Sequence, residues 1–389
     1  MSAVASAYEY LRTSPKADSS RIPDFMLGMA MPLTVSLPGV PANLSILALL
    51  GAIGLAVLRK PDPGDKMPWW APAIAAGMIG WMTLSLLYNG LNTYLQLAYF
   101  VGWVLSILAF ASGRLDRLSL CRGISVGLVI GALAGLASRF AGIGGDQYPG
   151  RLTGYVWGDP NQAGYYLTVL TCLALIGLRP GWRRWLALAL FTVCIVLTLS
   201  RTSMVAMCVA SLWFAVRRRA TPGIGVALVA AAAYVLNDLS DRLKNWGPFA
   251  QRAGSDMLRE RIDAISAQLV TINPIIGRGP GTAFVEVQDQ TFFFHNAYLA
   301  VRNNGGWILL ILLLTLIALV AIRMLSRPSA EHHPWHEAAL IAVLICSLSL
   351  GEALLRAPSA LAIGLALRHA INPFELRNSD KDDSPDHVL

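Results

Sequence analysis

The stretch "TFFFHNAYLAVRNNGGWILLILLLTLIALVAI", residues 291–322, joins a histidine that follows three phenylalanines to a long apolar run. About twenty consecutive apolar residues are what a helix needs to cross the hydrocarbon core of a bilayer. The run shows neither the alternation of a strand nor a polar face. It therefore predicts a membrane-spanning helix, with His295 just before its first residue.

The rest of the chain repeats this pattern. Of its 389 residues, 55% are hydrophobic and 14% are charged, whereas about 25% are charged in an average soluble protein. Backbone groups in lipid must be satisfied internally, which favours helices. We therefore predict an all-α, polytopic integral membrane protein with about 12 transmembrane helices. The apolar blocks lie near residues 24–38, 42–58, 69–87, 93–111, 119–138, 162–178, 185–200, 203–216, 222–236, 297–322, 337–350 and 355–369.

The basic residues predict how the chain is oriented. The net charge is +8, but the basic residues lie in short clusters between apolar blocks, so we expect no nucleic-acid partner. With alternating crossings, 20 of the 31 Lys and Arg residues fall on one side together with both termini. By the positive-inside rule that side is cytoplasmic. The first 21 residues lack the apolar centre of a signal peptide, so we expect the first helix to be an uncleaved anchor.

This topology divides the chain into three parts. Residues 1–236 form transmembrane helices 1–9, and residues 296–389 form helices 10–12 and a cytoplasmic tail. Residues 237–295 form one large loop on the outer face, with an amphipathic helix in "SDMLRERIDAISAQLVTINP", residues 255–274. Its predicted apolar stripe is Met257, Ile262, Ile265 and Leu269. No CxxC pair or metal-ligand spacing occurs, so we expect no metal and no cofactor.

Three cationic or titratable side chains on the outer face suggest chemistry. Arg201 follows the seventh block, Arg259 lies on the loop helix, and His295 lies where the loop re-enters the bilayer. Structural interpretations also exist: Arg201 can snorkel, Arg259 can belong to a solvated face, and His295 can sit in an interfacial aromatic belt. Together, however, arginine forks suit phosphate oxygens, and a histidine accepts a proton near neutral pH.

Further outer-face residues are candidates for substrate binding. Asp159 and Asn161 in "GDPN" also fit a turn and a helix cap. "GRGPGTAF" is glycine-rich but matches no phosphate-binding fingerprint. Glu286 and Asp289 are alternative bases to His295. The candidate substrate-binding set is Arg151, Asn161, Arg261, Asn296, Gly279 and Gly281.

Four segments in this order resemble the core of the O-antigen ligase and polymerase superfamily. They are "RLTGYVWGDPNQAGYYL", "LTLSRTSMVAM", "RERIDAISAQLVTINPIIGRGPGTAF" and "HNAYLAVRNNGGWILL", within residues 150–320. The resemblance implies a bacterial inner-membrane glycosyltransferase that acts on the periplasmic side with an undecaprenyl-pyrophosphate-linked glycan donor. It also implies an inverting, metal-independent displacement.

The resemblance assigns roles to individual residues. Arg201 matches the family's Ser-Arg motif, and His295 matches its proposed catalytic histidine. Arg259 matches the arginine of an Arg-x-x-x-Trp segment, although Asp263 stands where the family has the aromatic residue. Gly305 and Gly306 match a small pair that lets helices approach closely.

Several functions remain open. A ligase would transfer the glycan to lipid A-core, and a polymerase would transfer it to another lipid-linked glycan. Transfer to a protein is a third possibility, although no added domain for it is visible. A transporter or flippase would keep ionisable groups near mid-membrane, whereas here the charges gather at one face. The moderate length of the chain and its single modest outer loop favour the ligase. We also expect the protein to contact membrane lipids.

Overall fold

The structure is a computed structural model that describes residues 21–36, 39, 42–61, 66–141, 150–179, 181–217, 222–243, 253–326 and 334–372. The predicted cytoplasmic ends, residues 1–20 and 373–389, lie outside this range. The described helices are α2 (Ile22–Ala30), α3 (Leu44–Leu58), α4 (Trp70–Tyr88), α5 (Tyr94–Ala111), α6 (Arg117–Ala141), α7 (Gly154–Trp157), α8 (Pro160–Gly177), α9 (Trp182–Leu197), α10 (Arg201–Val216), α11 (Pro222–Leu243), α12 (Ala253–Leu269), α13 (Ala297–Leu325), α14 (Pro334–Cys346), η3 (Ala353–Leu355) and α15 (Ala357–Ile371).

The prediction of a largely helical protein is confirmed, and the apolar helices make a membrane protein plausible. Each apolar block of the sequence contains one of these helices. Four of the described helices, α4, α5, α6 and α13, are long and apolar enough to cross a membrane by length and composition. The nine-residue α2 rises about 14 Å, well short of a hydrocarbon core of about 30 Å. The number of membrane crossings, about twelve, therefore stays a prediction.

Three helices form the centre of the bundle. Along α8, α14 and α15 almost every residue is buried. By contrast, α4, α5 and α13 expose large apolar side chains such as Leu87, Leu95 and Ile311. A soluble bundle would place polar residues there. An inner group of helices sheltered by lipid-facing helices accounts for both patterns.

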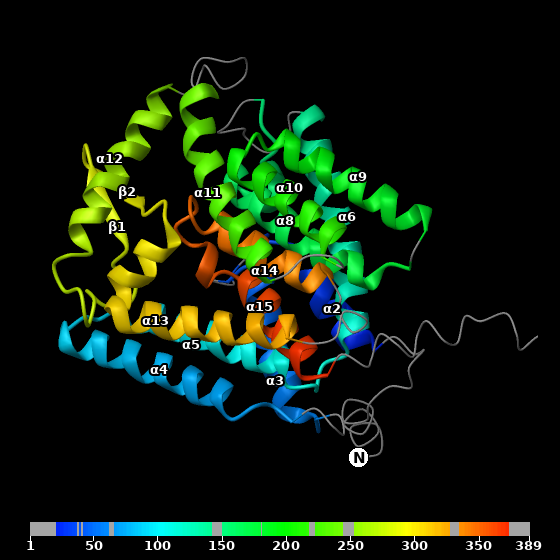
Figure 1. Ribbon diagram of the computed structural model, residues 1–389, viewed down its shortest axis with the longest axis horizontal. Coiled ribbons are helices and arrows are strands. Elements are labelled where there is room, and N and C mark those ends of the chain that lie inside the picture. Colours follow the sequence, from blue (N-terminus) through cyan, green and yellow to red (C-terminus); the bar gives the residue numbers. More distant parts are fainter. Residues whose placement is uncertain are drawn as a thin grey trace, which may run out of the picture.

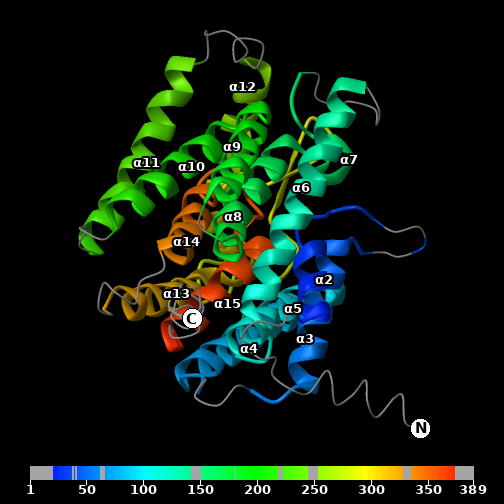
Figure 2. The same ribbon diagram turned by 90° about the vertical axis from the view of Figure 1, so that its right-hand side faces the viewer.

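Glycines set a close contact between α2 and α6, which lie side by side in Figure 2. A Cβ atom on Gly28 would lie 2.0 Å from the carbonyl oxygen of Leu120, and one on Gly123 would lie 2.0 Å from that of Phe25. Small residues of this kind let helix backbones pack directly in membranes. The short α2 is thereby held against the longer α6.

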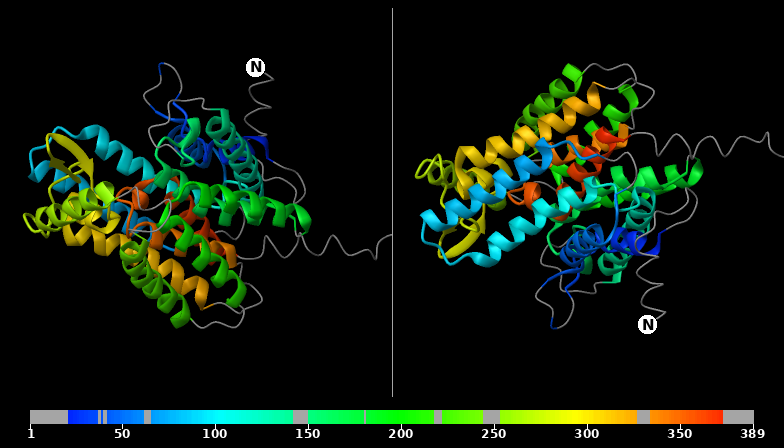
Figure 3. Two further views of the ribbon diagram at one scale, coloured as in Figure 1. Left: turned by 90° about the horizontal axis from the view of Figure 1, so that it is seen from above. Right: turned by 90° about the horizontal axis from the view of Figure 1, so that it is seen from below.

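One end of the bundle carries the long loop between α11 and α13. Figure 1 shows α12 and a hairpin there, next to the start of α13, and Figure 3 shows the same end from above and below. The hairpin pairs β1 (Phe284–Val287) with β2 (Gln290–Phe293) in antiparallel register, Val285 opposite Phe292. The sequence analysis did not predict it. We call this end of the bundle the loop end.

The predicted orientation can be tested with single cysteines in a cysteine-free background. Ala264 on α12 and Lys66 before α4 are both exposed, and the positive-inside rule places them on opposite sides. We expect an impermeant maleimide to label Ala264→Cys in intact cells and Lys66→Cys only after permeabilisation. The reverse pattern would contradict the orientation.

Candidate functional site at the loop end

The long loop has its own small hydrophobic core. Ile262, Val270, Val285 and Phe294 are buried together, with Leu258, Ile265, Leu269 and Phe292 around them. The predicted amphipathic helix is therefore present, but Met257 of the predicted stripe is 66% exposed. The core fixes α12, the hairpin and the chain that enters α13 relative to one another.

The hairpin turn places the two alternative bases away from this core. Gln288 and Asp289 have φ angles of 53° and 60°, which is the conformation of a two-residue hairpin turn. Asp289 thus lies at the tip, and Glu286 is exposed on β1. The charged groups that act on the pKa of His295 are Arg259 and Asp159, and neither of these two carboxylates is among them.

His295 lies between β2 and α13 and is half-buried. The flanking backbone is fixed, because Phe294 N–H donates to the Ala283 carbonyl at 3.2 Å and Ala297 N–H donates to the Ser347 carbonyl at 2.9 Å. The pKa of His295 is lowered to about 4, mainly by burial and also by the positive charge of Arg259, while Asp159 acts in the opposite direction. At neutral pH the imidazole is therefore uncharged and able to accept a proton.

Asn296 caps the re-entering helix. Its side-chain oxygen accepts hydrogen bonds from Tyr298 N–H at 2.9 Å and Leu299 N–H at 3.1 Å. A capping side chain of this kind satisfies two of the free N–H groups at a helix start. This geometry accounts for Asn296 without a substrate, and its predicted role in substrate binding remains a prediction.

On α12, Arg259 and Arg261 differ as a two-residue helical spacing requires. Arg259 is half-buried and acts electrostatically on His295, whereas Arg261 is exposed. Residues two apart lie on different faces of a helix. The structure thus brings Arg259 and His295 together and leaves Arg261 on the solvated face.

The start of α8 connects His295 to Arg201. Asp159, which influences the pKa of His295, caps α8 by accepting from the N–H groups of Asn161 at 2.8 Å and Gln162 at 2.9 Å. One turn further along α8, a Cβ atom on Gly164 would lie 2.8 Å from that of Ser203 and 3.1 Å from that of Ser200, the residue before Arg201. The start of α8 therefore lies near His295 and near the start of α10, the helix that carries Arg201.

Arg151 and Asn161 hold this region together. The guanidinium of Arg151 donates to the Thr198 carbonyl at 2.8 Å and to the Asn161 side-chain oxygen at 3.1 Å. These bonds tie the chain before α8 to the turn between α9 and α10. The structure thus gives both residues a positioning role, while substrate contact by either remains a prediction.

Arg201 is the first residue of α10 and is only 9% exposed. Leu199, two residues before Arg201, has a φ of 52°, a left-handed conformation that costs a non-glycine residue about 1–2 kcal/mol. Strain of this kind persists where the surroundings impose it, often at functional sites. The tight turn starts α10 immediately at Arg201 and keeps that residue at the loop end.

The glycine-rich segment after α12 is docked into a break in α13. Gly305 and Gly306 have non-helical backbone angles inside α13. Arg278 N–H donates to the Asn303 carbonyl at 2.6 Å, Gly279 N–H to the Asn304 carbonyl at 3.0 Å, and Trp307 N–H to the Pro274 carbonyl at 2.8 Å. The loop thus satisfies backbone groups that the break exposes.

Gly279 and Gly281 pack against the segment that connects α4 to α5 and against the start of α5. A Cβ atom would lie 2.3 Å from the Leu91 side chain at Gly279 and 2.6 Å from the Gln96 side chain at Gly281. Both have positive φ angles, which glycine adopts at little cost. These contacts explain both glycines structurally, and phosphate binding by them stays a prediction.

Gly306 offers a stability test. Its φ is +67°, and a Cβ atom would lie 1.9 Å from the Ile275 carbonyl oxygen. We expect Gly306→Val to lower the free energy of unfolding by on the order of 3 kcal/mol, measured as a lower thermal midpoint in detergent. Gly54→Val is the matched control, because a Cβ atom there meets nothing within 4 Å. Equal midpoints for the two variants would contradict the docking described here.

Two features of the loop end were not predictable from the sequence. Arg302 lies over the ring of Trp307 at 4.1 Å across the break in α13. Arg356 forms an ion pair with Glu352 just before α15. The only sequence feature that could have pointed to Arg302 and Arg356 is that each is a cation near the end of a predicted membrane span. Within the described residues, no group of three or more His, Cys, Asp and Glu side chains is placed to hold a metal ion.

Comparison with known proteins gives one match to a family model. No curated protein matches the chain significantly. The matched segment, residues 186–314, runs from α9 to the middle of α13 and contains Arg201, Arg259 and His295. The description of that family is O-antigen ligase, and the match supports placing this chain in the O-antigen ligase superfamily.

Proposed function

We propose that this protein transfers a glycan from undecaprenyl pyrophosphate to a sugar hydroxyl of lipid A-core at the periplasmic face of the bacterial inner membrane. The observation that carries the proposal is the neutral, half-buried His295 held beside Arg259. Arg201 begins α10 directly after Ser200, which packs against Gly164 near the start of α8. A base and two phosphate-binding forks at one membrane surface suit such a donor.

The reaction is a single inverting displacement. The acceptor hydroxyl oxygen attacks the anomeric carbon while His295 takes the hydroxyl proton. The bond from that carbon to the pyrophosphate oxygen breaks, and the pyrophosphate leaves with the electron pair. Arg201 and Arg259 stabilise the charge that grows on it, and positioned donors of this kind are worth about 3–4 kcal/mol each.

The negative charge of the bound donor makes His295 a stronger base. In the free protein Arg259 disfavours the imidazolium ion. A bound pyrophosphate places negative charge beside His295 and neutralises Arg259, and nearby negative charge raises the pKa of a histidine. Proton affinity therefore increases where the donor is already bound, which favours transfer over abortive protonation of the free site.

The pH dependence follows from this. The kcat/KM for transfer reports the free protein, so its acid limb should lie near pH 4, the lowered pKa of His295. Activity is present above that pKa, where His295 is neutral, and is lost below it. The acid limb of kcat should lie at higher pH, because the bound donor raises the pKa. An acid limb of kcat/KM near 6.5 would contradict the burial of His295.

The decisive assay uses purified protein in liposomes with an undecaprenyl-pyrophosphate glycan and lipid A-core acceptor. We expect acceptor-linked glycan to form, and to form equally in EDTA. Chain growth on the lipid-linked donor in the absence of acceptor would identify a polymerase instead. Loss of activity in EDTA with rescue by magnesium or manganese would contradict the metal-independent displacement.

A further inference from the structure

Taking a proton puts a positive charge on His295, in surroundings that disfavour it. His295 lies directly before Asn296, which caps α13, and a helix N-terminus carries about half a positive elementary charge. Arg259 adds a full positive charge from α12. In the proposed reaction the pyrophosphate of the donor offsets these charges, but it departs as its bond breaks. A negative charge fixed in the protein is therefore needed to stabilise the imidazolium ion throughout the reaction.

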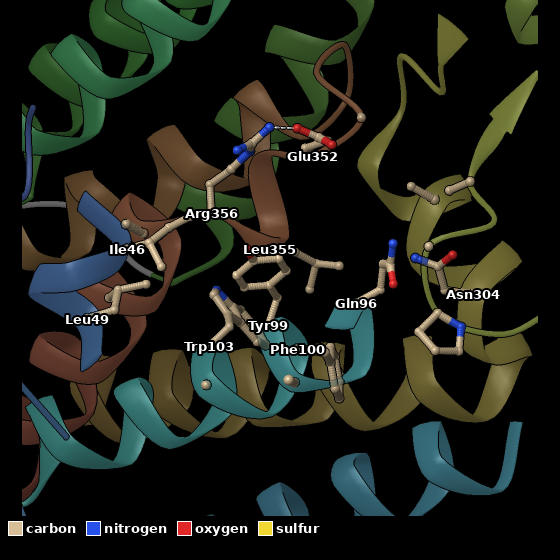
Figure 4. A pocket seen from close by; sticks show the side chains of 18 of the residues that line it. Ile46, Leu49, Gln96, Tyr99, Phe100, Trp103, Asn304, Glu352, Leu355 and Arg356 are labelled. Atoms are coloured by element: carbon tan, nitrogen blue, oxygen red, sulfur yellow. Dashed lines mark ion pairs between the residues drawn. The ribbon is translucent and has the colours of Figure 1, made fainter. Parts of the chain in front are cut away.

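Most carboxylates at the loop end cannot supply this charge. Glu352 is engaged in the ion pair with Arg356 that Figure 4 shows at the edge of the cavity between α3, α5 and the start of α15. On α12 and the hairpin the described carboxylates are exposed: Glu260, Asp263, Glu286 and Asp289. Among the described carboxylates, Asp159 is the one whose charge acts on His295.

The start of α8 fixes the Asp159 carboxylate. Its Oδ1 atom accepts from two N–H groups, those of Asn161 at 2.8 Å and Gln162 at 2.9 Å. The N–H of Asp159 donates to the Trp157 carbonyl at 2.8 Å, and the buried Trp157 indole donates to the Pro32 carbonyl at 2.8 Å. No residue in the described ranges donates a hydrogen bond to the second oxygen, Oδ2. One oxygen thus holds the carboxylate in place while the other keeps its lone pairs.

The connection between α14 and α15 joins the start of α8 to the chain around His295. The hydroxyl of Tyr165, in the second turn of α8, donates to the Ala353 carbonyl at 2.7 Å. Two residues earlier in this connection, a Cβ atom on Gly351 would lie 1.5 Å from the Phe294 carbonyl oxygen and 3.4 Å from the His295 nitrogen. Both segments therefore pack on one short stretch of backbone. The placement of Asp159 near His295 is a consequence of main-chain packing rather than of a flexible side chain.

We propose that Asp159 is the counter-ion of the imidazolium ion that forms on His295 during transfer. The proposal rests on the proposed function, because it concerns the proton that the proposed reaction moves. That proton passes from the acceptor hydroxyl to His295, while the pyrophosphate departs with the electron pair of the broken bond. Asp159 takes no proton and touches no substrate atom. It is a positioning residue whose negative charge acts through His295 and remains after the leaving group has gone.

Asp159→Asn tests the charge without the cap, because asparagine caps helices as well as aspartate does. We expect an unchanged thermal midpoint, an unchanged KM for the donor and a kcat about tenfold lower, the factor that corresponds to one pKa unit of the base. A residue that only caps α8 would instead leave Asp159→Asn fully active. In that case only Asp159→Ala, which also removes the cap, would lose activity, together with thermal stability.

Asp116→Asn is the matched control, since it makes the same change at the start of another helix. The Asp116 carboxylate accepts from the Ser119 N–H at 2.7 Å in the first turn of α6, and the positive-inside rule places it on the cytoplasmic side. We expect Asp116→Asn to keep the kcat of the unaltered protein. Equal kcat values for Asp159→Asn and Asp116→Asn would overturn the counter-ion role.

A second measurement needs no substrate and separates this proposal from the proposed function. Diethyl pyrocarbonate modifies only the neutral imidazole, so the pH midpoint of His295 modification, followed by peptide mass spectrometry, reports the pKa of His295. Arg259→Gln serves as the background, because removing that positive charge raises this pKa into a range that is easily measured. There Asp159→Asn should lower the midpoint by about one unit, and Asp116→Asn should not move it.

The outcomes of the two measurements are distinct. A midpoint that Asp159→Asn leaves unmoved would overturn the counter-ion assignment even if transfer depends on His295. A lowered midpoint in a protein that transfers no glycan would contradict the proposed function and support the pairing of Asp159 with His295.

Discussion

Replacing His295 with glutamine is expected to reduce glycan transfer by about 10²–10⁴-fold. Glutamine can still donate and accept a hydrogen bond, but it cannot take the proton of the acceptor hydroxyl. Donor binding should change little, because in the proposed mechanism the arginines hold the pyrophosphate. The measurement is transfer by purified protein in liposomes, with donor binding measured separately.

Phe293→Leu provides the matched control for this prediction. Phe293 lies two residues before His295 and is 61% exposed, so it occupies the interfacial position that a non-catalytic His295 would share. If His295 only anchors the loop at the membrane surface, both substitutions should have similar, small effects. Transfer by His295→Gln at the level of Phe293→Leu would reject the catalytic role.

His295→Ala adds a check on folding. The side chain is half-buried, and its neighbours in the backbone are held by Phe294 and Ala297 through main-chain hydrogen bonds. Because those bonds do not involve the imidazole, we expect a thermal midpoint close to that of the unaltered protein. An inactive variant that keeps its thermal midpoint locates the defect in chemistry rather than in folding.

Helix positions were predictable from the sequence because lipid imposes one rule on every residue of a span. Apolar blocks therefore coincide with described helices from α2 to α15. The ends of these helices were less predictable, because caps and docked loops decide them. The α2 helix ends after nine residues near Pro32, and the break at Gly305–Gly306 depends on a loop that lies about thirty residues earlier in the chain.

The candidate site shows the same division. Arg201, Arg259 and His295 stood out because charge is rare next to apolar blocks. The proximity of Arg259 and His295 could not be read from the sequence, since it depends on the cluster of Ile262, Val285 and Phe294 that fixes the loop. The Asp159 influence on His295 was missed for the same reason. The sequence near Asp159 predicts that this residue caps a helix, whereas its proximity to His295 is set by tertiary packing.

Replacing Arg201 or Arg259 with lysine should each reduce transfer by about 10²–10³-fold. Lysine keeps the positive charge but loses the planar fork that holds two phosphate oxygens. The Arg259→Lys substitution also keeps a positive charge beside His295. The pKa of His295 should therefore remain low, and the acid limb of kcat/KM should not move. Arg259→Gln removes that charge and should shift the acid limb to higher pH.

Arg261→Lys is the matched control, since it makes the same chemical change two residues from Arg259 on an exposed face of α12. We expect transfer within a few-fold of the unaltered protein, in line with the small effects of exposed charges, about 0–1 kcal/mol. An essential Arg261 with a dispensable Arg259 would reverse the assignment of the two faces.

The double variant, Arg201→Lys with Arg259→Lys, tests whether both arginines hold the same group. Independent sites would multiply their effects, because substitutions without shared partners add in free energy. Two forks on one pyrophosphate act as a unit, so once one is lost the leaving group is already misplaced. The double variant should therefore lose clearly less than the product of the single losses. A fully multiplicative loss would mean that Arg201 and Arg259 act on different parts of the substrates, for example donor and acceptor.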